Sequence, residues 1–175
     1  MNGDILPGLV GLGLGALLVF LGIQAYALWQ KKLAIKEKRE EAFRTLIPLR
    51  LQAYERLVLL LERISPEQLI ARMPEEGRDG PAWVAQQWIV QSIREEFQHN
   101  ITQQIYVEEA TWIKIRESVD QLIWQVNQIP AQLSAEADGR TFLKTWVRFR
   151  MDHPNILEDA LSSIRQDMQK EWRGE

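Results

Sequence analysis

Glu96 and His99 are the pair whose residue types and spacing best fit the chemistry of a site. A Glu and a His three positions apart share one face of a helix, and carboxylate-bridged di-iron bundles use two such pairs with two further Glu residues. The chain has this motif once, because Arg150 stands three positions before the second histidine, His153. We therefore expect no metal site and no cofactor, unless a dimer supplies the missing half of the ligand set. Metal analysis of the purified protein decides between these alternatives.

Other catalytic patterns are missing from the sequence. It has no cysteine, which excludes disulfides, thiolate metal sites and cysteine nucleophiles. It also has no Gly-rich phosphate loop, no Walker pattern and no serine nucleophile elbow. A net charge of −3 gives no case for general nucleic-acid binding. These observations favour a protein that is not an enzyme and does not bind nucleic acid.

The element that would position the rest of the chain is an apolar run over residues 5–29. As a helix it would be roughly 37 Å long, enough to cross a hydrocarbon core of about 30 Å. Asp4 precedes the run and a group of basic residues follows it, which predicts an outside N-terminus and a cytoplasmic remainder. The residues expected at the membrane interface are Tyr26, Trp29, Lys31 and Lys32.

A cleaved signal peptide is the alternative for this run, since Ala25 and Ala27 flank Tyr26 in a small-x-small pattern. The run is too long for a signal peptide, and no Lys or Arg precedes it, so we favour the anchor.

Four glycines of the run share one helix face, and two of them form a GxxxG pair that lets helix backbones approach closely. This pattern indicates a homo-oligomer contact in the membrane, although glycine is also simply frequent in membrane helices. The glycines are Gly8, Gly11, Gly15 and Gly22.

The remaining sequence predicts an all-α protein with three parts: an anchor over residues 1–30, a charged helical stalk over 31–47 and a multi-helix bundle over 48–175. Pro48 should kink or restart the helix. Apolar residues at helical spacing indicate core helices over residues 51–64, 82–105, 112–129, 135–151 and 157–172, with a short helix over 66–72. Residues 73–81 are expected to form a loop, and residues 152–155 a turn.

For two polar or basic stretches, the sequence allows more than one environment. Gln103 and Gln104 are expected on the solvent side of the helix over 82–105. Residues 140–150 carry basic side chains on one face and aromatic side chains on another. This pattern is typical either of a bundle helix with a basic outer face or of a helix resting on an anionic membrane surface.

Two phrases of the sequence, LQAYERLVLLLERISPEQLIAR and IREEFQHNITQQIYVEEATW, resemble an uncharacterised family of bacterial single-pass membrane-anchored helical proteins with a domain of unknown function. The resemblance covers nearly the whole chain. It implies an N-terminal anchor followed by helices, and it transfers no catalytic residue.

Together these observations predict a single-pass protein of the cell (inner) membrane with a cytoplasmic bundle. We expect a non-enzymatic interaction or scaffold module whose partners are the lipid bilayer, a second copy of the chain and another protein. The alternatives are a metal-binding protein using Glu96 and His99, or a protein that binds the membrane surface through residues 140–150.

Overall fold

The computed structural model describes the backbone of residues 5–153 and 155–173, and the side chains of residues 19–38, 41, 44–153 and 155–170. The chain divides into two compact units, Met1–Pro48 and Leu49–Glu175.

The first unit consists of the N-terminal part of helix α1, Ile5–Arg63. The restart predicted at Pro48 does not occur, because the helix continues on both sides of this residue. Proline has no amide hydrogen, so only the backbone hydrogen bond to the carbonyl of residue 44 is lost there. Within the part of the chain that the structure describes, no helix is both long enough and apolar enough to cross a membrane.

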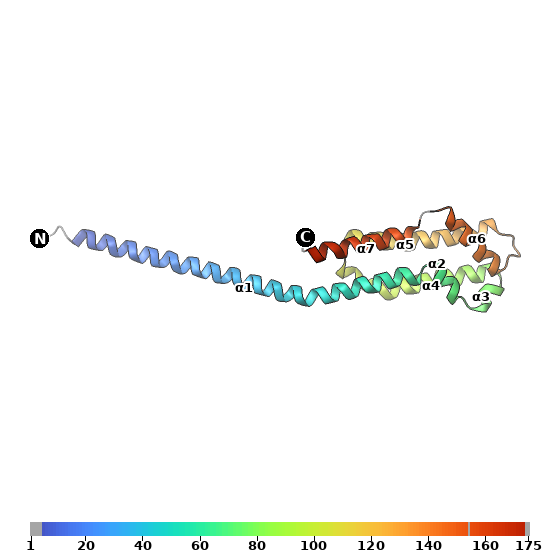
Figure 1. Cartoon of the computed structure of the whole chain (residues 1–175), viewed down its shortest axis with the longest axis horizontal. Helices are drawn as coiled ribbons and strands as arrows, with labels where there is room; N and C mark the ends of the chain where they lie inside the picture. The colour runs from blue at the N-terminus through green and yellow to red at the C-terminus, as the bar shows by residue number, and fades with distance from the viewer. Residues whose placement is uncertain (1–4, 154, 174–175) are drawn as a thin grey trace. The chain divides into compact units, whose positions relative to one another are not determined.

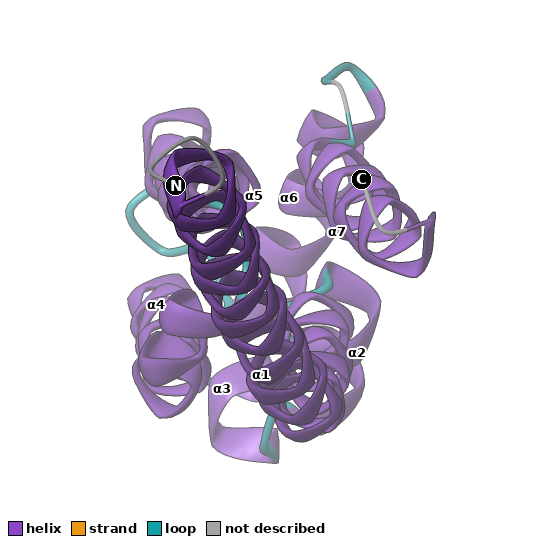
Figure 2. Cartoon of the chain, turned by 90° about the vertical axis from the view of Figure 1, so that its left-hand side faces the viewer, coloured by secondary structure: helices purple, strands orange, loops and turns teal. Residues whose placement is uncertain are grey.

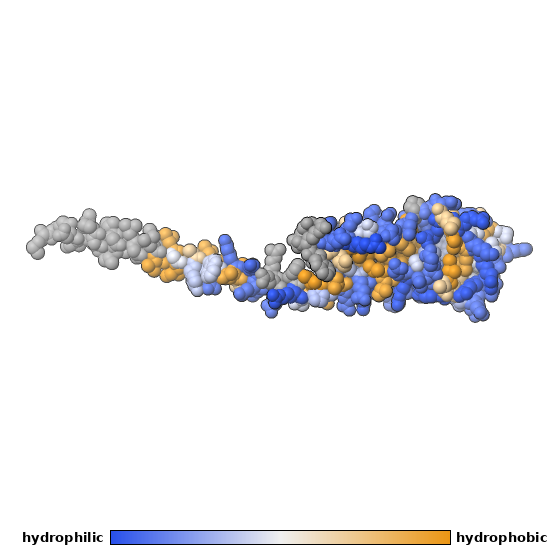
Figure 3. Space-filling view, viewed as in Figure 1, coloured by the Kyte–Doolittle hydropathy of each residue, from blue (hydrophilic) through white to orange (hydrophobic). Residues whose placement is uncertain are grey.

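Large apolar side chains of the first unit are exposed wherever they are described. The ones that come directly before the lysines are Val19, Phe20, Leu21, Ile23, Tyr26, Leu28 and Trp29. Figure 3 shows orange, hydrophobic atoms along this part of α1. Gly22 lies among them, and a methyl group added there would meet no atom within 4 Å. The other three glycines of the predicted contact, Gly8, Gly11 and Gly15, lie outside the residues whose side chains are described.

The second unit is a bundle of helices, which confirms the all-α prediction for the residues described (Figures 1 and 2). After the end of α1 its elements are α2 Pro66–Arg72, α3 Glu75–Asp79, α4 Ala82–Asn100, the 3-10 helix η1 Ile101–Tyr106, α5 Glu109–Gln128, the 3-10 helix η2 Ile129–Gln132, α6 Gly139–Met151 and α7 Ile156–Arg173. Helix α5 packs against α7, and α4 packs against both α6 and α5.

Most of the apolar stripes that the sequence predicts lie in the core of the bundle. Burying one such leucine or isoleucine contributes about 1.5–3 kcal/mol, so these positions dominate stability. The fully buried members include Leu57, Leu60, Ile64, Ile89, Ile93, Ile115, Leu122, Val126, Phe142 and Trp146. Leu51, which was expected in the first stripe, is exposed instead.

The loop predicted over residues 73–81 is wrong, because α3 forms inside it. Two acidic residues in its first turn, Glu75 and Glu76, stabilise the helix because their negative charge lies at the positive end of the helix dipole. Gly77 packs against Met73, since a methyl group added at Gly77 would lie 2.9 Å from the Met73 Cγ. Gly77 is therefore a residue of a compact helical turn, and Gly80 follows the end of α3 in extended backbone.

Residues 80–82 are joined to residues 137–139 by backbone hydrogen bonds. The Gly139 N–H donates to the Gly80 carbonyl at 2.8 Å, and the Ala82 N–H donates to the Ala137 carbonyl at 2.9 Å. A methyl group added at Gly139 would collide with the Gly77 carbonyl oxygen. Helix α6 therefore begins at Gly139 rather than near Ala135, with the Asp138 side chain capping its first turn.

The long helix predicted over residues 82–105 changes type at Ile101. A 3-10 helix has about three residues per turn, so residues four apart no longer share a face. Ile101 and Ile105 consequently leave the core, and the Ile105 side chain is 74% exposed. Gln103 turns inward and is buried, which contradicts its predicted place on the solvent side.

Candidate functional site

Glu96 lies on α4 and joins three helices. Its carboxylate oxygens each lie 3.4 Å from a guanidinium nitrogen, one of Arg63 on α1 and one of Arg72 on α2. Arg72 also donates to the Arg63 carbonyl at 2.6 Å. The Glu96 side chain is only 16% exposed, so two cations neutralise a carboxylate with little access to water. This arrangement fits a structural ion pair better than a metal ligand or a catalytic acid.

His99 is exposed and does not pair with Glu96. Its Nδ1 lies 2.7 Å from the Glu95 carbonyl oxygen, which can only accept, so Nδ1 carries the hydrogen. His153 has the same contact with the Phe149 carbonyl and also stacks on the Phe149 ring. Among the residues described, no three Asp, Glu or His side chains gather as a metal site would require.

A groove of about 820 Å³ runs along α4 beside His99. Five side-chain amides contribute to its lining, and they can donate and accept hydrogen bonds as a peptide backbone does. One of them crosses between helices, since Gln86 on α4 donates to Asn127 on α5 at 2.9 Å. The lining residues are Trp83, Gln86, Gln87, Val90, Gln91, Arg94, Glu95, Gln98, His99 and Asn127.

A smaller pocket of about 210 Å³ adjoins the groove and shares Trp83 and Gln86 with it. Its other lining residues are mostly apolar: Pro81, Ala82, Pro130, Leu133, Ser134, Ala135 and Ala137. The Trp83 side chain is 63% exposed and stands where the two hollows meet. We call the larger hollow, along α4, the Trp83 groove.

The residues predicted at the membrane interface lie on the first unit. Tyr26 and Trp29 are exposed, with ring centroids 6.2 Å apart. The Tyr26 hydroxyl accepts a hydrogen bond from Gln30 at 2.8 Å, and Lys31 and Lys32 follow with exposed side chains. These aromatic and basic residues are neighbours along one stretch of α1.

The family of the chain is decided by a match over almost its full length. A model of a family of unknown function (DUF7935) matches residues 4–171. The chain belongs to this family. The match covers all of α1 to α6 and nearly all of α7, so both units of the chain fall within the family model. No curated protein and no solved structure matches the chain.

Sequence reasoning missed Trp83 and the amides around it. Gln86, Gln91 and Asn127 carry no motif, and they meet only because α4 and α5 pack side by side. The exposed tryptophan just after Pro81 was an available signal, because most of the other aromatic side chains described in the bundle follow a core stripe.

Proposed function

We propose that the chain is a single-pass membrane protein whose helical bundle binds another protein on the cytoplasmic face. The observation that carries the proposal is the exposed apolar surface of α1 between Val19 and Trp29, which ends at two lysines. A helix that is apolar on all sides favours a lipid environment over water. Aromatic residues followed by lysines are typical of the cytoplasmic boundary of such a helix.

The first half of the apolar run supports the same proposal from sequence alone. The finding that no described helix could cross a membrane concerns the part of the chain that the structure describes. The side chains of residues 5–18 lie outside that part, and they are apolar apart from the glycines. Together with residues 19–29 they complete a run of the length that a bilayer requires.

Alkaline carbonate extraction of cell membranes tests the anchor. We expect the full chain to stay in the membrane pellet, and a variant with Leu21→Lys and Ile23→Lys to be released. Protease added to intact spheroplasts should leave the bundle uncut. Release of the unaltered chain by carbonate would contradict the anchor, and digestion of the bundle would contradict its orientation.

The Trp83 groove is the place where we propose that the protein partner binds. Exposed tryptophans in well-formed pockets contribute strongly to binding between proteins. The amides of the groove match the hydrogen-bonding groups of an extended peptide, and the adjoining pocket can accept an apolar side chain.

Crosslinking in cells tests the groove. A photo-crosslinking amino acid placed at Gln87 should capture one reproducible partner, and Trp83→Ala should reduce the yield at least tenfold. Trp124→Ala is the matched control, because Trp124 is an exposed tryptophan of α5 that lines neither hollow. Equal capture by Trp83→Ala and by the unaltered chain would exclude the groove as the binding site.

Self-association through the membrane helix is a further part of the proposal. Replacing Gly11 and Gly15 by leucine should lower the signal of a membrane-dimerisation reporter, because leucine prevents close approach of the two backbones. Leucine at Gly22 should have a smaller effect, since that position lies outside the GxxxG pair. An unchanged signal from the Gly11 and Gly15 variant would rule out this contact.

A further inference from the structure

One face of α6 is both basic and apolar, and it points away from the core. At about 100° per residue, its five members fall within an arc of about 100°. We call this set the outer face of α6: Arg140, Lys144, Val147, Arg148 and Met151. All five side chains are exposed. Phe142 and Trp146 occupy the opposite arc and are fully buried, so the helix is oriented by its aromatic core contacts.

The charge of α6 is unusual for this chain. The helix contains four basic residues and no acidic residue, whereas the whole chain has a net charge of −3. Arg140 pairs with Asp79, with its Nε 2.6 Å from Oδ1. Arg150 lies outside the outer face and is 3.8 Å from a Glu67 oxygen. Lys144 and Arg148 have no hydrogen bond or ion pair with any residue that the structure describes.

Two apolar side chains lie among these charges. Met151 is 81% exposed, and Val147 is 41% exposed. Solvent-exposed cations alone would suit water, but cations that surround exposed apolar groups suit a boundary between an anionic and an apolar phase. A bilayer that contains anionic lipids has both phases in adjacent layers, the negatively charged headgroups and the apolar acyl chains.

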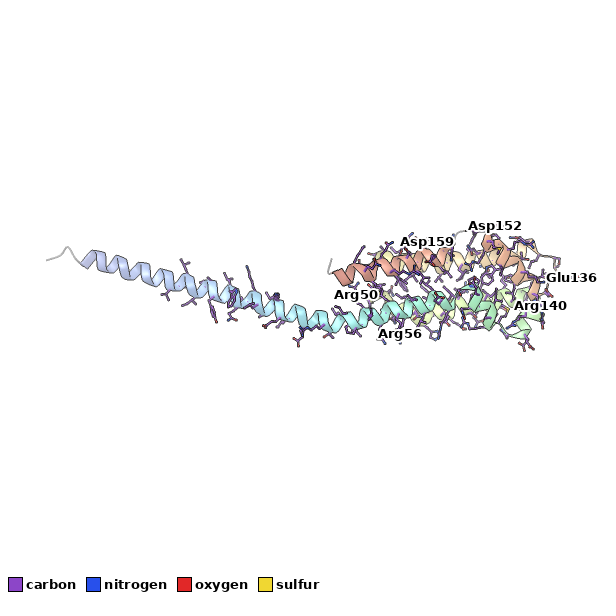
Figure 4. The ribbon with its side chains drawn as sticks, viewed as in Figure 1. Arg50, Arg56, Glu136, Arg140, Asp152 and Asp159 are labelled. Atoms are coloured by element: carbon purple, nitrogen blue, oxygen red, sulfur yellow. The ribbon has the colours of Figure 1, made fainter. Side chains whose placement is uncertain are left out.

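We propose that the outer face of α6 binds the surface of a membrane rich in anionic lipids. Lys144 and Arg148 would contact lipid phosphates, and Met151 with Val147 would enter the boundary between headgroups and acyl chains. Arg140 lies at the end of the second unit opposite Arg50, near which the chain enters that unit (Figure 4). The contact would give the bundle a point of membrane contact that shares no residue with the Trp83 groove.

Few charges contribute, so the contact is weak by itself and sensitive to salt. Tethering to the same membrane would raise the local concentration of lipid and strengthen it. The chemistry does not require the anchor, because the outer face would meet anionic lipid in the same way on any vesicle.

The full chain, which has no cysteine, allows one fluorescent label to be placed at a chosen site. An environment-sensitive dye on Met151→Cys is compared in nanodiscs of phosphatidylcholine alone and of phosphatidylcholine mixed with phosphatidylglycerol. We expect a blue shift of the emission, and quenching by brominated lipid, only in the anionic discs. High salt should reverse both effects. A dye on Glu117→Cys, an exposed site on α5, should report water in both discs.

Charge variants then test the source of the shift. Lys144→Gln with Arg148→Gln should lose most of the blue shift, whereas Arg116→Gln with Lys170→Gln removes the same charge from other helices and should keep it. Unchanged far-UV circular dichroism establishes that both variants fold. If the chain does not insert into discs, the same comparison is made by mixing it with preformed vesicles, so failure of the anchor leaves this test intact.

Four results would overturn the proposal. The first is an equal emission spectrum in neutral and anionic membranes. The second is a shift that survives the loss of Lys144 and Arg148. The third is equal loss in the Arg116 and Lys170 variant, which would mean that total charge, rather than this face, drives the contact. The fourth is binding of an acidic protein that removes the dye from water without any lipid.

Discussion

The Asp167 carboxylate on α7 accepts a hydrogen bond from the backbone N–H of Glu108 at 2.9 Å. Glu108 is the N-cap residue directly before α5, so a side chain from the last helix fixes the start of another helix. Asp167 also lies 3.8 Å from an Arg50 guanidinium nitrogen, and Arg50 donates to the Tyr54 hydroxyl at 3.0 Å. The Asp167 side chain is 4% exposed, so these polar groups join α1, α5 and α7 inside the bundle.

Replacing Asp167 by alanine should lower the free energy of unfolding by about 3 kcal/mol, because Arg50 loses a buried partner and the Glu108 N–H loses its acceptor. Asp167→Asn keeps an acceptor oxygen and should cost less. Urea unfolding of the full chain in detergent, followed by circular dichroism, measures both. A loss below that of an ordinary surface substitution would show that the carboxylate is not important for stability.

Burial raises the pKa of Tyr54 from 10.0 to about 12, and nearby Asp167 adds to the rise while the hydrogen bond from Arg50 opposes it. Tyr54 is thus neutral in both states below pH 10. Between pH 10 and about 12 it ionises only in the unfolded chain, so its contribution to stability is full below pH 10 and is lost as the pH rises through that window. Between pH 10 and about 12, the free energy of unfolding should decrease less steeply with pH for Tyr54→Phe than for the unaltered chain. Identical slopes for the two proteins would contradict this assignment.

Gly139→Ala should destabilise the bundle by about 1–3 kcal/mol, the usual cost of forcing an extra methyl group into a packed region. The added carbon would collide with backbone carbonyls of α3, which cannot move as a flexible side chain can. Gly22→Ala is the control, since that position is open and alanine favours a helix. Thermal unfolding compares the two variants. Equal midpoints for Gly139→Ala and the unaltered chain would mean that α3 moves to accommodate the methyl group without a loss of stability.

Glu96→Gln should lower stability by about 1 kcal/mol, because two partly exposed ion pairs with Arg63 and Arg72 are lost together. A chelator should leave the melting temperature of the unaltered chain unchanged. The metal-binding alternative predicts the opposite, namely a lower melting temperature with chelator and a stoichiometric metal content by elemental analysis.

The sequence is sufficient to predict the helical class and most core positions, because apolar residues at a period of 3.6 must be covered. Leu57, Ile93, Ile115 and Trp146 all follow such stripes and are buried. The errors occur where tertiary contacts override local signals. Glycines usually end helices, yet Gly77 lies within α3 because α3 packs closely on Met73. The change to a 3-10 helix at Ile101 has no signal in the period of the preceding residues.

The functional surfaces were predictable to different extents. The basic and aromatic faces of residues 140–150 follow from spacing, and the structure separates them as expected: Phe142 and Trp146 are buried, whereas Lys144 and Arg148 are exposed. The ion pairs of Glu96 did not follow from spacing, because Arg63 and Arg72 come from two other helices. Contacts between residues far apart in the chain depend on packing angles that periodicity does not contain.

The hydrogen bonds between residues 80–82 and 137–139 close the segment from α4 to η2 into a ring. The exposed tip of that ring, Ser134 to Glu136, lies just outside the bonded pairs. An epitope tag or a fluorescent domain inserted at the tip would leave the closure untouched. A protease that cuts the chain at the same tip would leave both fragments held together through the hydrogen bonds between residues 80–82 and 137–139, so the bundle should stay assembled after the cut.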